Sequence, residues 1–72
     1  MARAEKLAER LCHCVILLCQ GKTLSVRVLT QLFGISPRTA RRDLARMACI
    51  MEFASPGCWR LAPELRRSFY HS

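Results

Sequence analysis

The sequence predicts a mainly α-helical domain, with three helices followed by a small β-hairpin. Three observations lead to this fold class. Apolar residues recur at helical spacing over much of the first 47 residues. Serine and glycine residues stand where helices are expected to begin and end. The pattern then changes to an alternation of apolar and polar residues over residues 49–62, on both sides of a Ser-Pro-Gly turn signal.

Length and composition bound the domain organisation. The chain has 72 residues, of which 51% are hydrophobic, and this is enough for one folded core. We expect residues 1–62 to form a single domain. Residues 63–72 are expected to form a C-terminal tail, as the start of a further helix or of a truncated domain.

The first helix is expected over residues 2–20 and carries two apolar stripes. Gly21 ends it, because glycine adopts the left-handed conformation that often follows a last helical turn. The first stripe, at i, i+4, i+7, i+8 and i+11, faces the core and consists of Leu7, Leu11, Cys14, Val15 and Leu18. The second stripe consists of Ala8, Cys12, Ile16 and Cys19. Either the hairpin or tail covers this second stripe, or it is the interface of a homodimer.

The second helix is expected over residues 26–33. A short extended segment, Thr23 and Leu24, precedes it, and Ser25 is a suitable N-cap. Gly34 provides the conformation needed at its C-terminal end. The residues available to the core are Val28, Leu29, Leu32 and Phe33.

The third helix is expected from Pro37 to about Met47, capped by Ser36 after a corner in which Ile35 packs. Its buried face is predicted to consist of Ala40, Leu44 and Met47. At about 100° per residue, four arginines fall about 100–240° from Ala40, on the opposite face. They are Arg38, Arg41, Arg42 and Arg46. Asp43 lies near the edge of the buried face, where it could hold Arg46 or Arg42.

The hairpin is expected to turn at residues 55–57 in a register where Ala54 faces Cys58. In that register Glu52 lies opposite Arg60 on one face. The other face is apolar and consists of Met51, Phe53, Trp59 and Leu61. Because Pro56 disfavours a helical Ser55, the turn need not be the common three-residue type.

The charge balance predicts an anionic partner. Twelve Lys and Arg residues, ten of them arginine, oppose five Asp and Glu residues, for a net charge of +7. Nucleic acid is the first candidate and an acidic membrane surface the second, while the bland alternative is that the charge only aids solubility. The longest apolar run, CVILLC, is too short to span a bilayer, and no signal peptide is evident. We therefore expect a cytoplasmic protein.

The five cysteines predict neither a metal site nor a disulfide. Cys12, Cys14 and Cys19 share one helix, where Cys12 and Cys14 point apart and Cys12 and Cys19 are too distant. The motif CHC lacks the Cys-x-x-Cys pairs of structural zinc sites. We expect buried thiols, no cofactor and no evident small-molecule site. The chain has one aspartate and no catalytic constellation, so we do not expect an enzyme.

The stretch LSVRVLTQLFGISPRTARRDLARM resembles the helix-turn-helix of the DeoR type. The positions that match its pattern are Gly34, Ile35, Ser36, Thr39, Arg42, Asp43 and Leu44. The first helix and the closing Trp-Arg-Leu also resemble the winged-helix head of WYL-domain regulators, so that the similarity covers residues from about 4 to 62. Two features differ: Ala40 replaces a branched residue, and Ala48-Cys49-Ile50 shortens the usual Glu-x-x-Gly-Leu before the wing.

The resemblance implies a winged helix-turn-helix and a sequence-specific transcription regulator, which we expect to be a repressor with its third helix in the major groove of double-stranded DNA. Arg38, Arg41 and Arg42 would then read bases or phosphates, since the planar guanidinium suits both. The remaining DNA-binding positions would be Ser36 and Thr39 at a phosphate, Arg46 on the backbone and Arg60 in the wing. Arg60 has an alternative as the cross-strand partner of Glu52. The alternative function is a protein-interaction module that binds an acidic protein partner.

Overall fold

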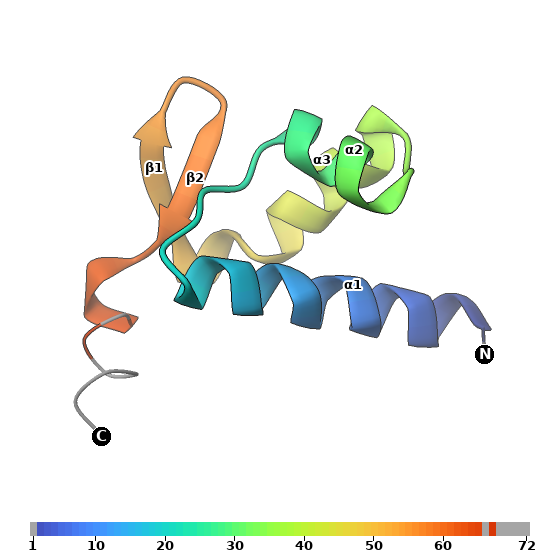
Figure 1. Ribbon diagram of the computed structural model, residues 1–72, viewed down its shortest axis with the longest axis horizontal. Coiled ribbons are helices and arrows are strands. Elements are labelled where there is room, and N and C mark those ends of the chain that lie inside the picture. The colour runs from blue at the N-terminus through green and yellow to red at the C-terminus, as the bar shows by residue number, and fades with distance from the viewer. Residues whose placement is uncertain (1, 66, 68–72) are drawn as a thin grey trace.

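The computed structural model describes the backbone of residues 2–65 and 67, and the side chains from residue 6 onward within those ranges. Three α-helices are followed by a short 3₁₀ segment and two strands, which is the architecture of a winged helix-turn-helix (Figure 1). The elements are α1 (Ala2–Cys19), α2 (Val26–Phe33), α3 (Pro37–Arg46), η1 (Ala48–Ile50), β1 (Met51–Ser55) and β2 (Cys58–Leu61). The predicted tail is helical at residues 63–65, and its last five residues lie outside the described part of the chain.

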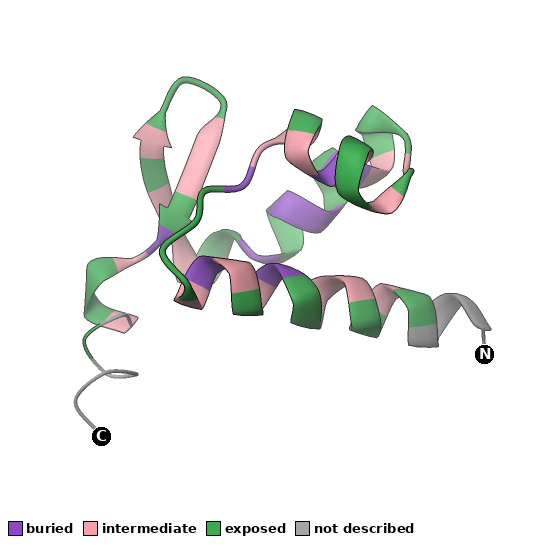
Figure 2. Cartoon of the chain, viewed as in Figure 1, coloured by how far each residue is buried: buried purple, intermediate pink, exposed green. Residues whose placement is uncertain are grey.

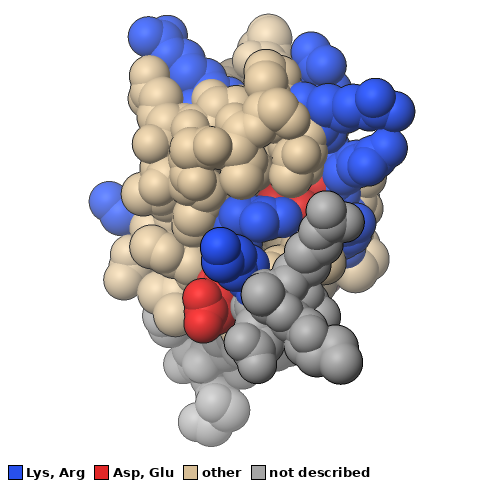
Figure 3. Space-filling model, turned by 90° about the vertical axis from the view of Figure 1, so that its right-hand side faces the viewer, with Lys and Arg blue, Asp and Glu red and all other residues tan. Residues whose placement is uncertain are grey.

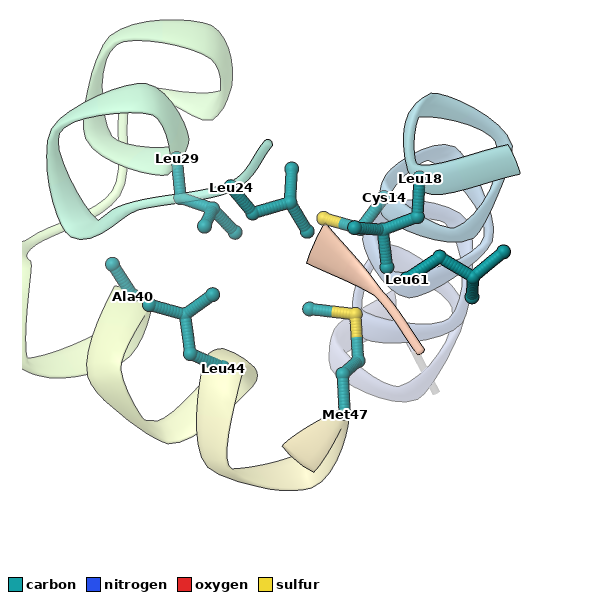
Figure 4. Close-up of a cluster of buried hydrophobic side chains, with 8 residues drawn as sticks. All are labelled: Cys14, Leu18, Leu24, Leu29, Ala40, Leu44, Met47 and Leu61. Carbon is teal, nitrogen blue, oxygen red and sulfur yellow. The ribbon is translucent and has the colours of Figure 1, made fainter. Parts of the chain in front are cut away.

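The helices and the hairpin enclose one small core. Figure 1 shows α1 along the long axis, with α2, α3 and the hairpin on the same side of it. Each helix and the second strand contribute buried side chains to the centre (Figure 4). These are Cys14, Leu18, Leu24, Leu29, Ala40, Leu44, Met47 and Leu61. No helix of the described residues is long and apolar enough to cross a membrane.

The corner between α2 and α3 is built by the predicted capping residues. The Ser25 hydroxyl accepts a hydrogen bond from the Val28 N–H at 3.1 Å and begins α2. Gly34 ends α2 with φ of +64°, a conformation that other residues adopt only at a cost. Ser36 accepts from the Thr39 N–H at 3.2 Å and begins α3, with Pro37 in its first turn. These caps set where each helix starts and stops.

The prediction that Leu32 lies in the core is wrong. Its side chain is 46% exposed, although it shares a face with the fully buried Leu29. At this last turn of α2 it is Phe33 that contacts α1, with its ring edge-on to His13 at a centroid distance of 5.4 Å. Phe33 therefore occupies the space next to α1, and Leu32 is left at the rim.

One residue of extended chain pairs with the hairpin. Leu24 and Trp59 exchange two backbone hydrogen bonds, of 2.7 Å and 2.8 Å, and form an isolated antiparallel bridge. The Leu24 side chain is buried in the core at the same time. The predicted extended segment before α2 is thus confirmed, and it holds β2 beside the start of α2.

The base of the hairpin has the predicted register, but its tip does not. Glu52 pairs with Arg60 and Phe53 with Trp59, whereas Cys58 pairs with Ser55 and not with Ala54. Ala54 is therefore the extra residue of a β-bulge. Pro56 and Gly57 form a two-residue turn, and Gly57 has the positive φ (+77°) that a type II turn requires. The backbone twist of a type II turn does not match the right-handed twist of the two strands. The bulge increases the local twist and so allows the turn to connect them.

The cysteines are not all buried, contrary to the prediction. Cys14 is fully buried, and this burial, with the nearby Asp43 carboxylate, raises the pKa of its thiol to about 11. Cys12 and Cys49 are exposed, because one lies on the second stripe of α1 and the other on the outer side of η1. Within the described residues there is no disulfide and no group of three residues able to hold a metal ion.

The second stripe of α1 lies largely in solvent. Ala8, Cys12 and Ile16 are exposed, and Ile16 has 55% of its surface accessible. Only Cys19, at the C-terminal end of the stripe, packs against the core. Among the described residues, the hairpin therefore does not cover this stripe.

Replacing Leu44 with alanine is expected to lower the free energy of unfolding by about 2–5 kcal/mol, because it leaves a cavity where α3 meets the core. Leu32→Ala is the matched control: the same deletion at an exposed helical position should cost about 0.5 kcal/mol or less. Urea unfolding followed by circular dichroism measures both. Equal losses in the two variants would contradict this assignment of the core.

Candidate nucleic-acid interface

One side of α3 lies in the core and the other side carries arginines. Ala40, Leu44 and Met47 are buried, as predicted from the helical wheel. Arg38, Arg41, Arg42 and Arg46 are all exposed, and the short Ala45 lies among them. Figure 2 shows buried and exposed residues following one another along α3. The helix thus presents a positively charged, sterically accessible face to a partner.

The carboxylate of Asp43 is fully buried beneath this face. Arg10, on α1, donates to it from Nε at 2.5 Å and from Nη2 at 3.2 Å. Arg46, one turn further along α3, donates from Nη1 at 2.8 Å. The prediction that Asp43 holds Arg46 is confirmed, while Arg42 makes no bond to it. The contact with Arg10 joins two helices that are 33 residues apart in sequence.

Arg10 is a residue that sequence reasoning missed. A buried carboxylate is stable only when cations and hydrogen-bond donors compensate for its lost hydration. The hydrogen bond from Arg10 to Asp43 raises the pKa of the Arg10 guanidinium, so that it stays charged. The sequence held a signal for this partner. Asp43 is three residues after Ala40 and thus near the predicted buried face, where its carboxylate requires a cation from the facing helix.

The first half of α1 adds further positive charge beside α3. Lys6 and Arg10, one turn apart on α1, line the same shallow depression as three residues of α3. Those three residues are Thr39, Arg42 and Arg46. Figure 3 shows several Lys and Arg side chains projecting side by side from one edge of the molecule. Two segments far apart in sequence therefore form one basic surface.

The hydroxyl groups at the start of α3 are partly engaged with each other. Ser36 accepts from the Thr39 N–H and donates to the Thr39 hydroxyl oxygen at 3.1 Å. The hydroxyl proton of Thr39 is left available for a further acceptor. Both residues thus lie beside the basic surface, with Ser36 mainly shaping the helix start.

The structure does not bring Arg60 together with the α3 arginines. Its Nε donates to Glu52 Oε2 at 2.5 Å across the hairpin, which is the second of its two predicted roles. It borders a different depression, shared with Gly21, Lys22 and Thr23 at the end of α1. Arg60 therefore lies on the hairpin face that is turned away from α3.

Fold and surface together define the class as a winged helix-turn-helix domain whose third helix carries a basic outer face. A family model for the DeoR-like helix-turn-helix domain matches residues 3–49, well over half of the chain, and the protein belongs to this family. No curated protein and no solved structure matches it. The matched segment begins at the second residue of α1, includes α2 and α3, and ends within η1. The chain is therefore a DNA-binding transcription regulator, and its likeness to WYL-domain heads stays a prediction.

Removing Arg10 is expected to destabilise the fold far more than removing Arg46, although both bind the same carboxylate. Arg10 is 16% exposed and bonds Asp43 through two nitrogens, so Arg10→Ala should cost about 3–5 kcal/mol. Arg46 is 46% exposed, so Arg46→Ala should cost about 1 kcal/mol or less. Thermal and urea unfolding of both variants measure this. Similar losses in the two variants would contradict the greater role assigned to Arg10.

Proposed function

We propose that this protein is a sequence-specific repressor that inserts α3 into the major groove of double-stranded DNA. The observation that carries the proposal is the two-sided character of α3. Its buried side is tied to α1 through Asp43, while its outer side consists of arginines around the short Ala45. A rigid helix with such a face can approach base edges closely, as a recognition helix must.

The proposed roles follow from position along α3. Arg38, Arg41 and Arg42 read base edges or neighbouring phosphates, because a guanidinium can bind guanine or phosphate through two parallel hydrogen bonds. Ser36 and Thr39 bind a phosphate at the helix start, where free N–H groups also point outward. Arg46 grips the backbone further along with the nitrogens that Asp43 leaves unused.

Two further basic residues contribute from outside α3. Lys6 adds a phosphate contact from α1, since it lines the same depression as Arg42 and Arg46. Arg60 reaches DNA from the wing only by leaving Glu52. Arg60 is exposed and Glu52 is half-buried, and ion pairs in contact with solvent contribute about 0–1 kcal/mol, so the exchange costs little.

Repression requires only that the domain occupies its site on DNA. A bound domain that fills the major groove over a promoter excludes other proteins from the same base pairs. Footprinting on DNA around its own gene, followed by transcription of that template in vitro, tests this. Increased transcription on binding would contradict repression.

We also propose that the exposed stripe of α1 forms a homodimer. Its residues Ala8, Cys12 and Ile16 are four apart and hence lie in one line along the helix. Antiparallel packing about Cys12 sets the large Ile16 of each copy against the small Ala8 of the other, while Cys19 lies at each edge. A two-fold dimer would place two α3 helices at half-sites about one turn of DNA apart.

Arg41→Ala and Arg42→Ala are each expected to weaken binding to a selected duplex by about 1–3 kcal/mol without changing the melting temperature, because both side chains are exposed. Lys22→Ala is the charge-matched control, at the far end of α1, and should leave affinity nearly unchanged. Fluorescence anisotropy across a salt series measures the affinity. Unchanged binding in both arginine variants, or salt-insensitive binding of the wild type, would favour the protein-interaction module instead.

Ile16→Glu is expected to convert the dimer to a folded monomer, because it places a charge in the proposed apolar interface. Leu32→Glu, at a residue of similar exposure on α2, should leave the dimer intact. Sedimentation at high micromolar concentration distinguishes the two states. A monomeric wild type, or an Ile16→Glu variant that remains dimeric, would exclude this interface.

A further inference from the structure

A largely apolar cavity of about 320 Å³ lies between the C-terminal half of α3 and the hairpin. Its volume is within the range of small-molecule sites. An apolar cavity of about 150 Å³ holds one benzene ring, so this one has room for about two fused rings. It is lined by Val26, Arg41, Leu44, Ala45, Ala48, Met51 and Trp59.

The cavity exists because small residues face a hairpin that is held from the other side. Ala45 and Ala48 provide only methyl groups on the helical wall. Trp59 is fixed by its two backbone hydrogen bonds to Leu24. Its ring packs edge-on against Phe53, at a centroid distance of 5.7 Å, and Phe53 itself is 57% exposed. The two aromatic rings thus support each other and leave the space above α3 open.

Arg41 makes the cavity favour a ligand with a negatively charged group. It is the one charged residue in the lining, and its side chain is exposed. Within the described part of the chain, no hydrogen bond or ion pair engages its guanidinium. A carboxylate fits such a guanidinium through two parallel hydrogen bonds. An occupant of this cavity is therefore apolar at one end and anionic at the other.

We propose that the cavity binds a small aromatic carboxylate, with its rings between α3 and Trp59 and its carboxylate on Arg41. The regulatory part of this inference rests on the proposed function, in which Arg41 contacts DNA. One guanidinium cannot hold the ligand carboxylate and a base or phosphate in the same way at the same time. The ligand therefore lowers the affinity for DNA, and DNA lowers the affinity for the ligand to the same extent.

The binding step is tested without DNA, with 2-naphthoate as the anionic probe and 2-naphthalenemethanol as its uncharged counterpart. Calorimetry and the emission of Trp59, the single tryptophan of the chain, report binding. Arg41→Ala should reduce 2-naphthoate affinity about tenfold or more and change the affinity for the alcohol little. Arg42→Ala removes the same charge next to Arg41, outside the lining, and should leave both affinities unchanged.

A cavity-filling variant provides a second test of the binding site. Ala48 is exposed and lies outside the proposed DNA contacts, so Ala48→Leu should fold with an unchanged melting temperature. It should lose binding of both probes because its larger side chain takes their space. Wild-type protein that does not bind 2-naphthoate at millimolar concentration overturns the proposal. Equal binding by the wild type and Ala48→Leu would do the same.

Competition with DNA tests the regulatory step separately. At 2-naphthoate concentrations tenfold above its dissociation constant, the apparent dissociation constant for a selected duplex should rise about tenfold. Ala48→Leu should bind the duplex as the wild type does and show no such rise. If 2-naphthoate binds but does not displace DNA, the regulatory inference fails while the proposed function stands. If no duplex is bound at all, the proposed function fails and the ligand site is judged by its own titration.

Discussion

The buried carboxylate of Asp43 is the constraint on which the placement of α3 depends. Among the described residues it is the one charged side chain with no exposed surface, and it lies where α1 and α3 meet. An ion in the interior is tolerated only while its partners stay in position. The two nitrogens of Arg10 therefore set the distance and angle between α1 and α3 more strictly than apolar contacts alone, which tolerate sliding.

This arrangement separates the two roles of α3, which are packing in the core and presenting arginines at the surface. The helix is anchored through Ala40, Leu44 and Asp43, so Arg38, Arg41 and Arg42 take no part in the core. Arg46 belongs to both sides, since one nitrogen binds Asp43 while nearly half of the side chain stays in solvent. A DNA-reading face can therefore vary in sequence while the helix itself remains fixed, and the capped corner at Gly34 and Ser36 maintains its direction.

The hairpin is attached differently, and its position creates the second feature of the surface. It is held by Leu61, which lies in the core at the base of the hairpin, and by the bridge between Leu24 and Trp59 further along β2. Phe53, on the neighbouring strand, packs edge-on against Trp59, and Trp59 itself packs partly against the core and lines the cavity beside α3. Ala48 of η1 is small and leaves room between α3 and the hairpin. The same geometry thus gives a wing and an apolar cavity next to Arg41.

The sequence by itself determined the elements whose signals are local. All three helices and the outward arginines were predicted from serine caps, from glycine at position 34 and from the helical spacing of the core residues. Each of these signals depends only on neighbours within one turn. Tertiary structure decided what depends on distant partners. The Arg10–Asp43 pair, the exposure of Leu32 beside Phe33 and the bulge at Ala54 each required knowing which elements meet. The sequence offered two roles for Arg60, and the structure selected the pairing with Glu52. The cavity also required it, because empty space arises only when α3 and the hairpin are placed together.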